Sequence, residues 1–396
     1  MWGLQSKFYD IFGKCQEVKF VKSPLRICPL GAHVDHQHGL VTGITLEASI
    51  DMAYSRNDDG FVRVRSLEFP DEDYFHVDDV PGLLPGFWGN YLRGAVLSLK
   101  RHFKITKGLN AVVRGKHPIG GLSSSAAVTT AYLLALCDVN EINISKEDLI
   151  NYNHWVETDF IGLNNGILDQ SANILGEYEH LMFMDCKTGE YELIKKPDNM
   201  EDFEIVVVYS GLSKMLICTD YNNRVDECKV AAWIIQELNN EKRKVLKETR
   251  LRDISQETYY KYKNQIPGKF AKRAEHFFTE NKRVLEGVEA WKRGDIKHFG
   301  RLMFESGKSS IVNYESGCPE LITIYNILIE TPGVYGARFS GAGYRGCCIG
   351  LVNPKYKEEI VESVKSQYPV KHPEYKDKYQ LYFSKTDGGA RILNDQ

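Results

Sequence analysis

The chain has 396 residues, a formal net charge of −3, 43% hydrophobic residues and 26% charged residues. This balance is typical of a folded globular protein, and the length predicts about two domains. A nucleic-acid-binding surface needs an excess of Lys and Arg, which this slightly acidic chain lacks, so we expect no nucleic-acid partner. No apolar run approaches the ~18 residues of a membrane span, so we expect no membrane partner.

Cysteine usage and the first residues bear on the compartment. Nine cysteines are spread along the sequence without a Cys-x-x-Cys pair. An odd number at irregular spacing predicts reduced thiols and not a disulfide framework. The first residues also lack the basic stretch followed by an apolar stretch that a secretory signal has. We therefore expect a cytoplasmic protein.

The first half of the chain mixes predicted strands and helices. The hydrophobic pattern predicts strands over 19–22, 25–28, several within 40–66, 109–114, 180–185 and 203–209, and helices over 88–103, 123–137, 145–160 and 166–176. Residues 185–202 are rich in Lys, Asp, Gly and Pro, which indicates a domain boundary. We therefore predict two domains, 1–200 and 201–396.

The second half is dominated by predicted helices and closes with strands. The helices are expected over 222–250, 270–293, 295–308 and 318–330, and the strands over 334–339, 346–352 and 378–384. Strands and helices alternate irregularly, and there is no internal repeat. The pattern predicts an α+β protein and not a doubly wound parallel sheet.

Residues 115–130 read GKHPIGGLSSSAAVTT and connect a predicted strand to a predicted helix. The glycine pair lets backbone pass close to a ligand, because no Cβ intervenes. Serines at the start of the helix would cap it and leave amide N–H groups pointing outward, where the helix dipole favours an anion. No Gly-Lys-Ser/Thr follows, so this is not a Walker A loop. The segment predicts a phosphate-binding loop, with a plain serine-capped turn as the alternative.

Residues 26–39 read RICPLGAHVDHQHG and bring His33, Asp35, His36 and His38 together in sequence. This density suggests zinc. On an extended chain, however, His33 and Asp35 would share one side and His36 and His38 the other, and no further segment completes a four-ligand set. A sugar site also fits, because a carboxylate accepts from vicinal hydroxyls and imidazole donates or accepts. A purely structural loop is the remaining alternative.

Residues 157–170 read ETDFIGLNNGILDQ and place Glu157 and Asp169 on either side of a glycine-bounded turn. One carboxylate could bind a hard cation such as Mg²⁺, and the other could take or orient the proton of a nucleophilic hydroxyl. The alternative is that both are solvated acids on helix surfaces. The apolar neighbours Ile167 and Leu168 weaken that alternative for Asp169 only.

Residues 333–350 read GVYGARFSGAGYRGCCIG, in which Gly341, Gly343 and Gly346 match the dinucleotide spelling G-x-G-x-x-G. A strand-like CCIGLV follows where that fold needs a helix, so the dinucleotide interpretation fails. A protein-kinase loop fails too, since the chain has no HRD or DFG triplet. We expect a glycine-rich strand–turn–strand that approaches a ligand through its backbone, with a plain hairpin turn as the alternative.

The ordered set of these segments resembles the GHMP small-molecule kinases, and within them the galactokinase branch. The resemblance covers nearly the whole chain and rests on Pro118–Ala126 (the ATP-phosphate loop), 26–39 (the sugar signature), Gly166–Gln170 and Ser340–Gly343. Only two residues separate Pro118 from Gly121, fewer than in the family pattern. The resemblance implies a two-domain α+β fold, with an N-terminal domain like ribosomal protein S5 domain 2 and the site in the cleft between the domains.

The resemblance also implies phosphorylation of a sugar's anomeric hydroxyl with ATP and Mg²⁺. By position, Asp169 would be the base or the anion that orients the hydroxyl, Arg26 would hold the transferring phosphoryl group, and Ser125 and Glu157 would bind Mg²⁺. The positions that match ATP contacts are Trp88, Pro118, Gly120, Gly121, Leu122, Ser123, Ser124, Ser125, Gly341 and Gly343. Those that match sugar contacts are His33, Asp35, Gly166 and Tyr221.

The sugar signature departs from the branch at Ala32. Galactokinases read Gly-Glu-His-Thr-Asp-Tyr where this chain reads GAHVDH, and in the family that glutamate accepts from the sugar's 6-hydroxyl. Its loss should cost galactose roughly 1.5–3 kcal/mol. A carboxylate at C6 would instead be repelled by a glutamate ~4 Å away, by about 4 kcal/mol at an effective dielectric near 20. Ala32 therefore predicts D-galacturonate as substrate and α-D-galacturonate 1-phosphate as product.

The chain thus resembles the plant-type galacturonokinases, and segments 184–188 and 272–276 add to that resemblance. Tyr221 and Arg224 are the candidates for the uronate carboxylate, with a structural role as the alternative for Arg224. The other functions considered are a kinase for galactose or another neutral sugar, a sugar- and ATP-binding regulator without turnover, and a zinc protein through 33–38. Neither a monomer nor a homodimer is indicated.

Overall fold

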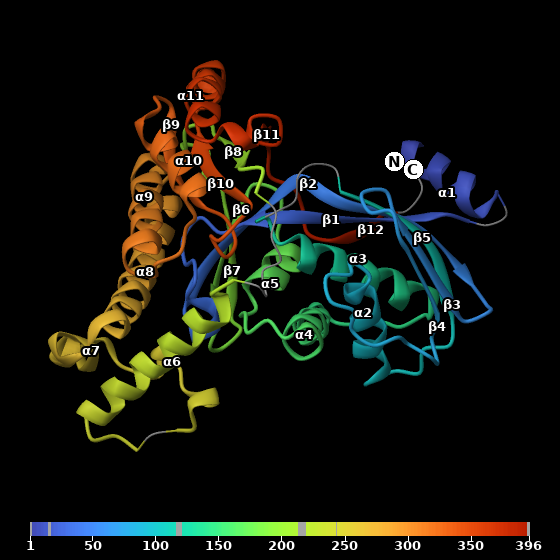
Figure 1. Cartoon of the computed structure of the whole chain (residues 1–396), viewed down its shortest axis with the longest axis horizontal. Helices are drawn as coiled ribbons and strands as arrows, with labels where there is room; N and C mark the ends of the chain where they lie inside the picture. The colour runs from blue at the N-terminus through green and yellow to red at the C-terminus, as the bar shows by residue number, and fades with distance from the viewer. Residues whose placement is uncertain (1, 15–16, 116–120, 213–218, 243, 394–396) are drawn as a thin grey trace.

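The computed structural model describes residues 2–14, 17–115, 121–212, 219–242 and 244–393, and its strands form two sheets (Figure 1). The larger has the order β12-β1-β2-β5-β3-β4, with β6 on β2 and β7 on β6. Its strands are β1 (Lys19–Ile27), β2 (Leu40–Asn57), β3 (Phe61–Ser66), β4 (Glu72–His76), β5 (Gly108–Gly115), β6 (His180–Asp185), β7 (Tyr191–Lys195) and β12 (Arg391–Leu393). All its pairs are antiparallel except β3 with β5.

Strand β2 runs unbroken through 18 residues, where the sequence pattern had predicted several strands. It pairs with β6 near its start and with β1 and β5 further on, from Leu40↔Asp185 to Asn57↔Gly108. The strands expected within 40–66 are therefore two, β2 and β3, because 40–57 contains no turn-forming pair. The first such signal is Asp58-Asp59-Gly60, where Gly60 takes a φ of +76°.

Helices cover the larger sheet on one side. They are α2 (Asn90–Lys100), α3 (Ser124–Val139), α4 (Lys146–Trp155) and α5 (Leu168–Leu175), with a π-helical turn, η2 (Val156–Ile161), after α4. Helix α3 contacts β1, β2 and α2 and is the centre of this layer. Helix α1 (Trp2–Phe12), which the sequence pattern had not indicated, packs Leu4 and Phe8 against Ala53 and Val112.

The smaller sheet has the order β11-β8-β10-β9 and is antiparallel throughout. Its strands are β8 (Glu204–Tyr209), β9 (Val334–Phe339), β10 (Cys347–Val352) and β11 (Gln380–Ser384). The helices of this half are α6 (Tyr221–Leu238), α7 (Gln256–Tyr262), α8 (Gly268–Lys292), α9 (Ile296–Val312), α10 (Pro319–Glu330) and α11 (Lys357–Lys371). Helices α8 and α9 form a long pair along one edge of the molecule in Figure 1.

The helix predicted over 222–250 ends at Leu238, twelve residues early. Asn239 is its C-cap, and Asn240 turns into the left-handed region with a φ of +53°. Asparagine tolerates that conformation, which is a common helix ending. The chain then continues through short 3-10 turns at Leu246–Glu248 and Leu251–Asp253.

Two observations bear on the predicted class and division. Helices and largely antiparallel sheets in separate layers confirm the α+β class. Residue 200 lies between β7 and β8, where the first sheet gives way to the second. Strand β12 returns to the first sheet by pairing with β1 (Phe20↔Leu393), so the division into 1–200 and 201–396 stays a prediction.

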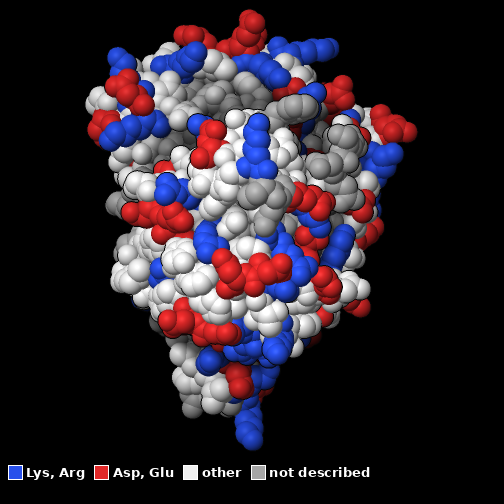
Figure 2. Space-filling view, turned by 90° about the vertical axis from the view of Figure 1, so that its right-hand side faces the viewer, with Lys and Arg blue, Asp and Glu red and all other residues white. Residues whose placement is uncertain are grey.

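The surface charges and the cysteines can be compared with what the sequence composition predicts. Acidic and basic side chains are interspersed over the face shown in Figure 2. Among the described helices, none is long and apolar enough to cross a membrane. The seven cysteines in the described part of the chain are all free.

Candidate active site

A cavity collects side chains from all four motifs singled out in the sequence. Its walls come from β1 and the loop after it, the start of α3, the η2–α5 turn, the first residue of α6 and the end of β9. The lining residues are Arg26, Cys28, Ala32, His33, Asp35, Ser125, Glu157, Leu163, Asn165, Leu168, Asp169, Tyr221, Phe339, Gly341 and Ala342. Segments more than 300 residues apart in sequence thus meet in one site.

Arg26 and Asp169 form an ion pair at the wall of this cavity. Arg26 donates to Asp169 Oδ1 through Nη2 (2.5 Å) and Nε (3.0 Å). Burial lowers the pKa of Arg26, but the charge and hydrogen bonds of Asp169, with smaller effects of Cys28 and Asp35, together outweigh it, and the pKa is raised. Both bonds end on Oδ1, which leaves Oδ2 for another donor. Arg26 Nη1 is buried and has no hydrogen-bond partner among the described residues.

Asp169 lies in the first turn of α5, where the helix dipole favours a carboxylate. Asn173, one turn later, donates to Pro24 O (2.6 Å) and to Ser23 Oγ (3.0 Å). These buried bonds fasten α5 to β1 two residues before Arg26. The ion pair is therefore positioned by the backbone of two elements.

Glu157 is buried, with 1% of its surface exposed, so the solvated alternative is wrong for this residue. Its Oε2 accepts from Asn165 Nδ2 and from Gln170 Nε2 (2.8 Å). Its Oε1 is buried without a hydrogen-bond partner in the described structure. Burial, and secondly the charge of Asp169, raise the pKa of Glu157 to about 7. A cation bound at Oε1 would offset both the cost of burying the Glu157 charge and its repulsion by Asp169. Glu157 and the neighbouring Ser125 therefore fit an oxygen-coordinated metal.

The phosphate loop is described only in part, since Pro118 and Gly120 lie outside the described residues. Gly121 has a φ of +87°, Ser123 one of +57°, and α3 begins at Ser124. The expectation that a serine caps the helix was wrong. Ser123 occupies the N-cap position without a side-chain cap bond. An N-cap residue needs an extended backbone to aim its hydroxyl at the first-turn amides, and Ser123 is left-handed instead. These amides therefore have no side-chain cap.

The loop is held from two sides by backbone contacts. Leu122 O accepts from Arg26 N (3.3 Å), which joins the loop to β1. On the other side, a Cβ added at Gly341 would lie 3.0 Å from Gly121 O. Gly341 and Gly343 lie in the turn between the antiparallel strands β9 and β10, at positive φ, which confirms the strand–turn–strand prediction.

The sugar-signature loop is bent, so the extended chain assumed in the argument about zinc does not form. Gly31 and His33 have φ of +93° and +60°, and Asp35–Gln37 form a turn of 3-10 helix (η1). His33 and Asp35 line the cavity, while His36 donates to or accepts from Tyr314 OH at 3.1 Å. Within the described chain, no cluster of metal-ligand atoms forms at 33–38, so the zinc hypothesis is wrong for this segment.

Close packing sets the middle of the sugar loop, at His33 and Asp35. The His33 ring stacks on Tyr314 with ring centroids 4.3 Å apart, and burial holds the pKa of His33 well below its usual value, so the imidazole is neutral. A Cβ at Gly166 would lie 2.5 Å from Asp35 C, so only glycine fits there. Burial, then the charge of Asp169, raise the pKa of Asp35 to about 6.

Ala32 faces the cavity from a rigid frame. Its carbonyl accepts from His276 Nε2 (2.9 Å), and the preceding Gly31 N–H donates to Glu280 Oε1 (2.8 Å). Glu280 is buried and interacts with Arg283 and Arg338. The alanine methyl is thus held at the wall by backbone contacts on both sides.

Several predicted site residues do not line the cavity: Trp88, Gly121–Ser124, Gly166, Arg224 and Gly343. Arg224 lies one helical turn after Tyr221 and pairs with Glu227 through Nη1 (3.2 Å), while its Nε is buried and unpartnered within the described structure. Trp88 lies just before α2 and stacks on Phe69, with centroids 6.3 Å apart. Its Nε1 is likewise buried and without a partner among the described side chains and backbone.

Several lining residues were not singled out from the sequence. Cys28 and Ala342 lie within the segments that carry the family resemblance but were given no role there, and Leu163 and Phe339 supply packing that no local signal marks. Asn165 does carry a signal, because it lies inside the glycine-bounded turn between the two carboxylates and bonds to Glu157.

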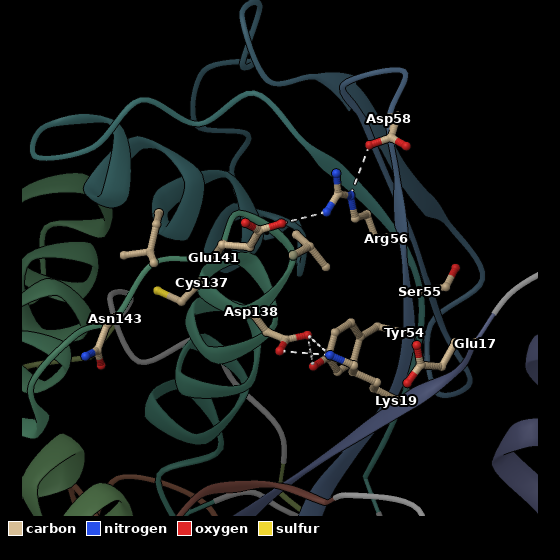
Figure 3. Close-up of a pocket in the computed structure, with 12 residues that line it drawn as sticks. Glu17, Lys19, Tyr54, Ser55, Arg56, Asp58, Cys137, Asp138, Glu141 and Asn143 are labelled. Atoms are coloured by element: carbon tan, nitrogen blue, oxygen red, sulfur yellow. Dashed lines mark hydrogen bonds and ion pairs between the residues drawn. The ribbon is translucent and has the colours of Figure 1, made fainter.

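A second hollow lies beside the C-terminal end of α3, against the larger sheet (Figure 3). Its polar groups are largely paired with one another. Asp138 accepts from Lys19 (3.0 Å) and Tyr54 (2.9 Å), and Arg56 lies between Asp58 and Glu141. None of the glycine loops contributes to it.

Comparison with known proteins agrees with the geometry. The family models "GHMP kinases N terminal domain" and "GHMP kinases C terminal" match residues 90–177 and 287–370. A galacturonokinase from Arabidopsis thaliana is 41% identical over 379 residues, 91% of this chain and 89% of that protein. The chain belongs to the GHMP kinase family. A galactokinase from Clostridium perfringens (strain 13 / Type A) is 34% identical over 369 residues, which are 92% of this chain and 93% of that protein.

Solved kinase structures have the same fold. Lactococcus lactis galactokinase complexed with galactose matches with a TM-score of 0.89 at 29% identity, covering 98% of both chains. A mevalonate kinase, at 17% identity and a TM-score of 0.63, shares the fold alone. The protein is therefore a GHMP sugar kinase of the galactokinase and galacturonokinase type, a phosphotransferase of a family that uses ATP.

Proposed function

We propose that this enzyme transfers the terminal phosphoryl group of ATP to the anomeric hydroxyl of D-galacturonate, giving α-D-galacturonate 1-phosphate and ADP. The observation that carries the proposal is Ala32, which lines the cavity where the galactokinase branch has a glutamate. An alanine methyl neither repels a carboxylate at C6 nor accepts from a 6-hydroxyl. The 41% identity to a galacturonokinase adds support.

A cluster of cations around Arg224, one helical turn after Tyr221, also favours an acidic sugar, whereas the charged groups that act on Tyr221 itself are chiefly the carboxylates of the cavity. Glu227 contacts Arg224, Lys269 and Arg273, and Glu315 contacts Lys272 and Arg273. Four cations thus share two carboxylates, which leaves a net charge of +2. Counting the nearby Asp220 reduces this net charge to +1. A local positive excess attracts an anionic substrate. Arg224, whose Nε is unpartnered in the described structure, and Tyr221 are the proposed partners of the uronate carboxylate.

The catalytic roles follow from the ion pair. Asp169 accepts the proton of the anomeric hydroxyl through its free Oδ2. At the same time the anomeric oxygen of the sugar bonds to the terminal phosphorus of ATP. The bond from this phosphorus to the bridging oxygen breaks, and that oxygen leaves with ADP. Arg26 Nη1 neutralises charge on the group in transit. Such transfers depend chiefly on positioning and charge stabilisation.

Ser125 and Glu157 would hold Mg²⁺, which when bound neutralises charge on the ATP phosphates. The sugar is oriented by His33, Asp35 and the close backbone of Gly166. Nucleotide contacts are proposed for Gly121–Ser125, Gly341 and Gly343, with Pro118 and Gly120 outside the described residues, and for Trp88, whose buried Nε1 donor has no partner in the described chain. We also propose a cytoplasmic location, which the free thiols support.

The test is to incubate the protein with ATP, Mg²⁺ and, separately, D-galacturonate, D-glucuronate and D-galactose, and to follow ADP release. We expect turnover chiefly with D-galacturonate. Turnover chiefly with D-galactose would replace the proposal by its second candidate, a galactokinase, which the 0.89 TM-score to a galactose-bound galactokinase favours. Binding of ATP and sugar without turnover would indicate a regulator.

A further inference from the structure

Arg345 is a cation for which the described structure shows no anion. It lies in the glycine turn between β9 and β10, and its Nε is buried with no hydrogen-bond partner in the described part of the chain. No carboxylate among the described residues forms an ion pair with it; the ionisable groups that act on it are the phenols of Tyr91 and Tyr209. Burial lowers the pKa of Arg345 below its ordinary value. A desolvated guanidinium without a counter-ion is costly unless a ligand supplies one.

The surroundings of Arg345 identify where that ligand would lie. Tyr91 is on α2, and its hydroxyl lies against Ser125 at the start of α3, within reach of the charge of Glu157. Two residues after Arg345, the N of Cys347 would lie 2.9 Å from a Cβ built on Gly121. Arg345 thus projects from a turn that packs against the phosphate loop. Tyr91 connects it to Ser125, one of the proposed Mg²⁺ ligands, and Arg345 is not among the residues that line the cavity.

Of the anions that the proposed reaction brings to this site, the nucleotide phosphates fit this position best. The uronate carboxylate is proposed to lie by Ala32 and Tyr221, with which Arg345 forms no hydrogen bond or ion pair in the described structure. Arginine also suits phosphate, because its planar fork presents several donors to phosphate oxygens.

We propose that Arg345 binds the phosphate groups of the nucleotide and supplies a positive charge to them in addition to Arg26. This inference rests on the proposed use of ATP by the same site. It goes beyond it by assigning a phosphate contact to the β9–β10 turn, whose glycines otherwise contribute backbone only.

The test compares nucleotide affinities of the full-length wild type, Arg345→Gln and Arg345→Lys by calorimetry without sugar. We expect Arg345→Gln to weaken ADP and ATP binding about 10- to 100-fold, the range for a lost charged hydrogen bond, and to leave adenosine binding unchanged. Arg345→Lys should retain part of the affinity. Arg301→Gln, an exposed arginine on α9, is the matched control and should bind like the wild type.

Folding is checked in the same variants by thermal unfolding without ligand. Because Arg345→Gln removes a desolvated charge that no described group compensates, its ligand-free melting temperature should equal or exceed that of the wild type. A variant with intact folding and weaker ADP binding supports the proposal.

Two results overturn the proposal. Unchanged ADP and ATP affinity in Arg345→Gln rejects the contact, as does a loss of D-galacturonate affinity with normal nucleotide affinity. Wild-type protein that binds no nucleotide rejects the proposed function together with this inference. Turnover of D-galactose alone, with ADP binding weakened in Arg345→Gln, rejects only the galacturonate assignment and supports the role of Arg345.

Discussion

Arg26 and Asp169, 143 residues apart in the chain, form a two-bonded ion pair that uses only one oxygen of the carboxylate. Asp169 Oδ2 and Arg26 Nη1 are thereby left for the two reacting partners, a hydroxyl and a phosphoryl group. Since β1 carries one residue and α5 the other, the pair couples the first sheet to the helix layer at the reacting centre.

Asp169→Asn should lower kcat by roughly 10²–10⁴, because the amide accepts no proton and aligns the hydroxyl less well. ATP affinity should stay close to that of the wild type. Steady-state kinetics and calorimetry on the same preparation measure both. Asp159→Asn, at an exposed aspartate of the η2 turn, is the control. Near-normal turnover in Asp169→Asn would contradict the assigned role.

Glu157→Gln should raise the Mg²⁺ concentration needed for half-maximal activity by at least about tenfold, since a neutral amide is a poorer ligand for a hard cation. Titrating MgCl₂ at saturating ATP measures the change. The amide keeps the size of the side chain, so packing is largely preserved. A variant with an unchanged Mg²⁺ dependence would show that the metal is held elsewhere.

Ala32→Glu should exchange the preferred sugar. Repulsion of about 4 kcal/mol at ~4 Å corresponds to a loss of about 10³ in kcat/KM for D-galacturonate, and a restored hydrogen bond predicts a gain of about tenfold or more for D-galactose. Ala32→Gln separates charge from size. If Ala32→Gln impairs D-galacturonate as severely as Ala32→Glu does, crowding and not charge explains the effect.

Arg224→Gln should raise the KM for D-galacturonate by about tenfold, the effect of losing a charged hydrogen bond, and leave the KM for ATP unchanged. Lys269→Gln removes a more exposed cation that shares Glu227 and tests the general field of the cluster. Equal effects of the two substitutions would assign the result to long-range charge and not to contact by Arg224.

The buried carboxyl of Asp35 predicts a pH dependence of sugar binding. Its pKa is raised to about 6 by burial and by Asp169, and only the ionised form accepts from two sugar hydroxyls. Affinity for the sugar should therefore fall about tenfold from well above pH 6 to pH 5 by proton competition. Calorimetry across this range measures it, and Asp35→Asn should bind more weakly with a flat profile.

The same shift has a consequence for stability. The pKa of Asp35 is higher in the folded state than the ordinary value of 3.8, so the folded state binds the proton more tightly. This group therefore lowers the free energy of unfolding as pH rises from about 4 to about 6, by at most about 1.4 kcal/mol per pH unit. Between pH 4 and 6, the slope of unfolding free energy against pH should be less negative in Asp35→Asn than in the wild type. Identical slopes would contradict the raised pKa of Asp35.

The sequence alone determined the segments that depend on near neighbours. Apolar periodicity placed α3, α5, β9 and β10, and glycine spacing located the turns around them. The four motifs that meet in the cavity were also found this way, because each is a contiguous stretch whose residue types carry its chemistry.

The tertiary structure alone decided which of those residues are buried, paired or left without a partner. Nothing local distinguished Glu157 from a surface acid, and its burial comes from Asn165, Gln170 and the helix layer. Arg224 is held by Glu227, whereas Arg345 has no acidic partner among the described residues. Burial and pairing depend on side chains from segments distant in the sequence. They determine the pKa values of the site and which hydrogen-bond donors are left without a partner. Sequence spacing does not encode them, because the fold sets the distances between segments.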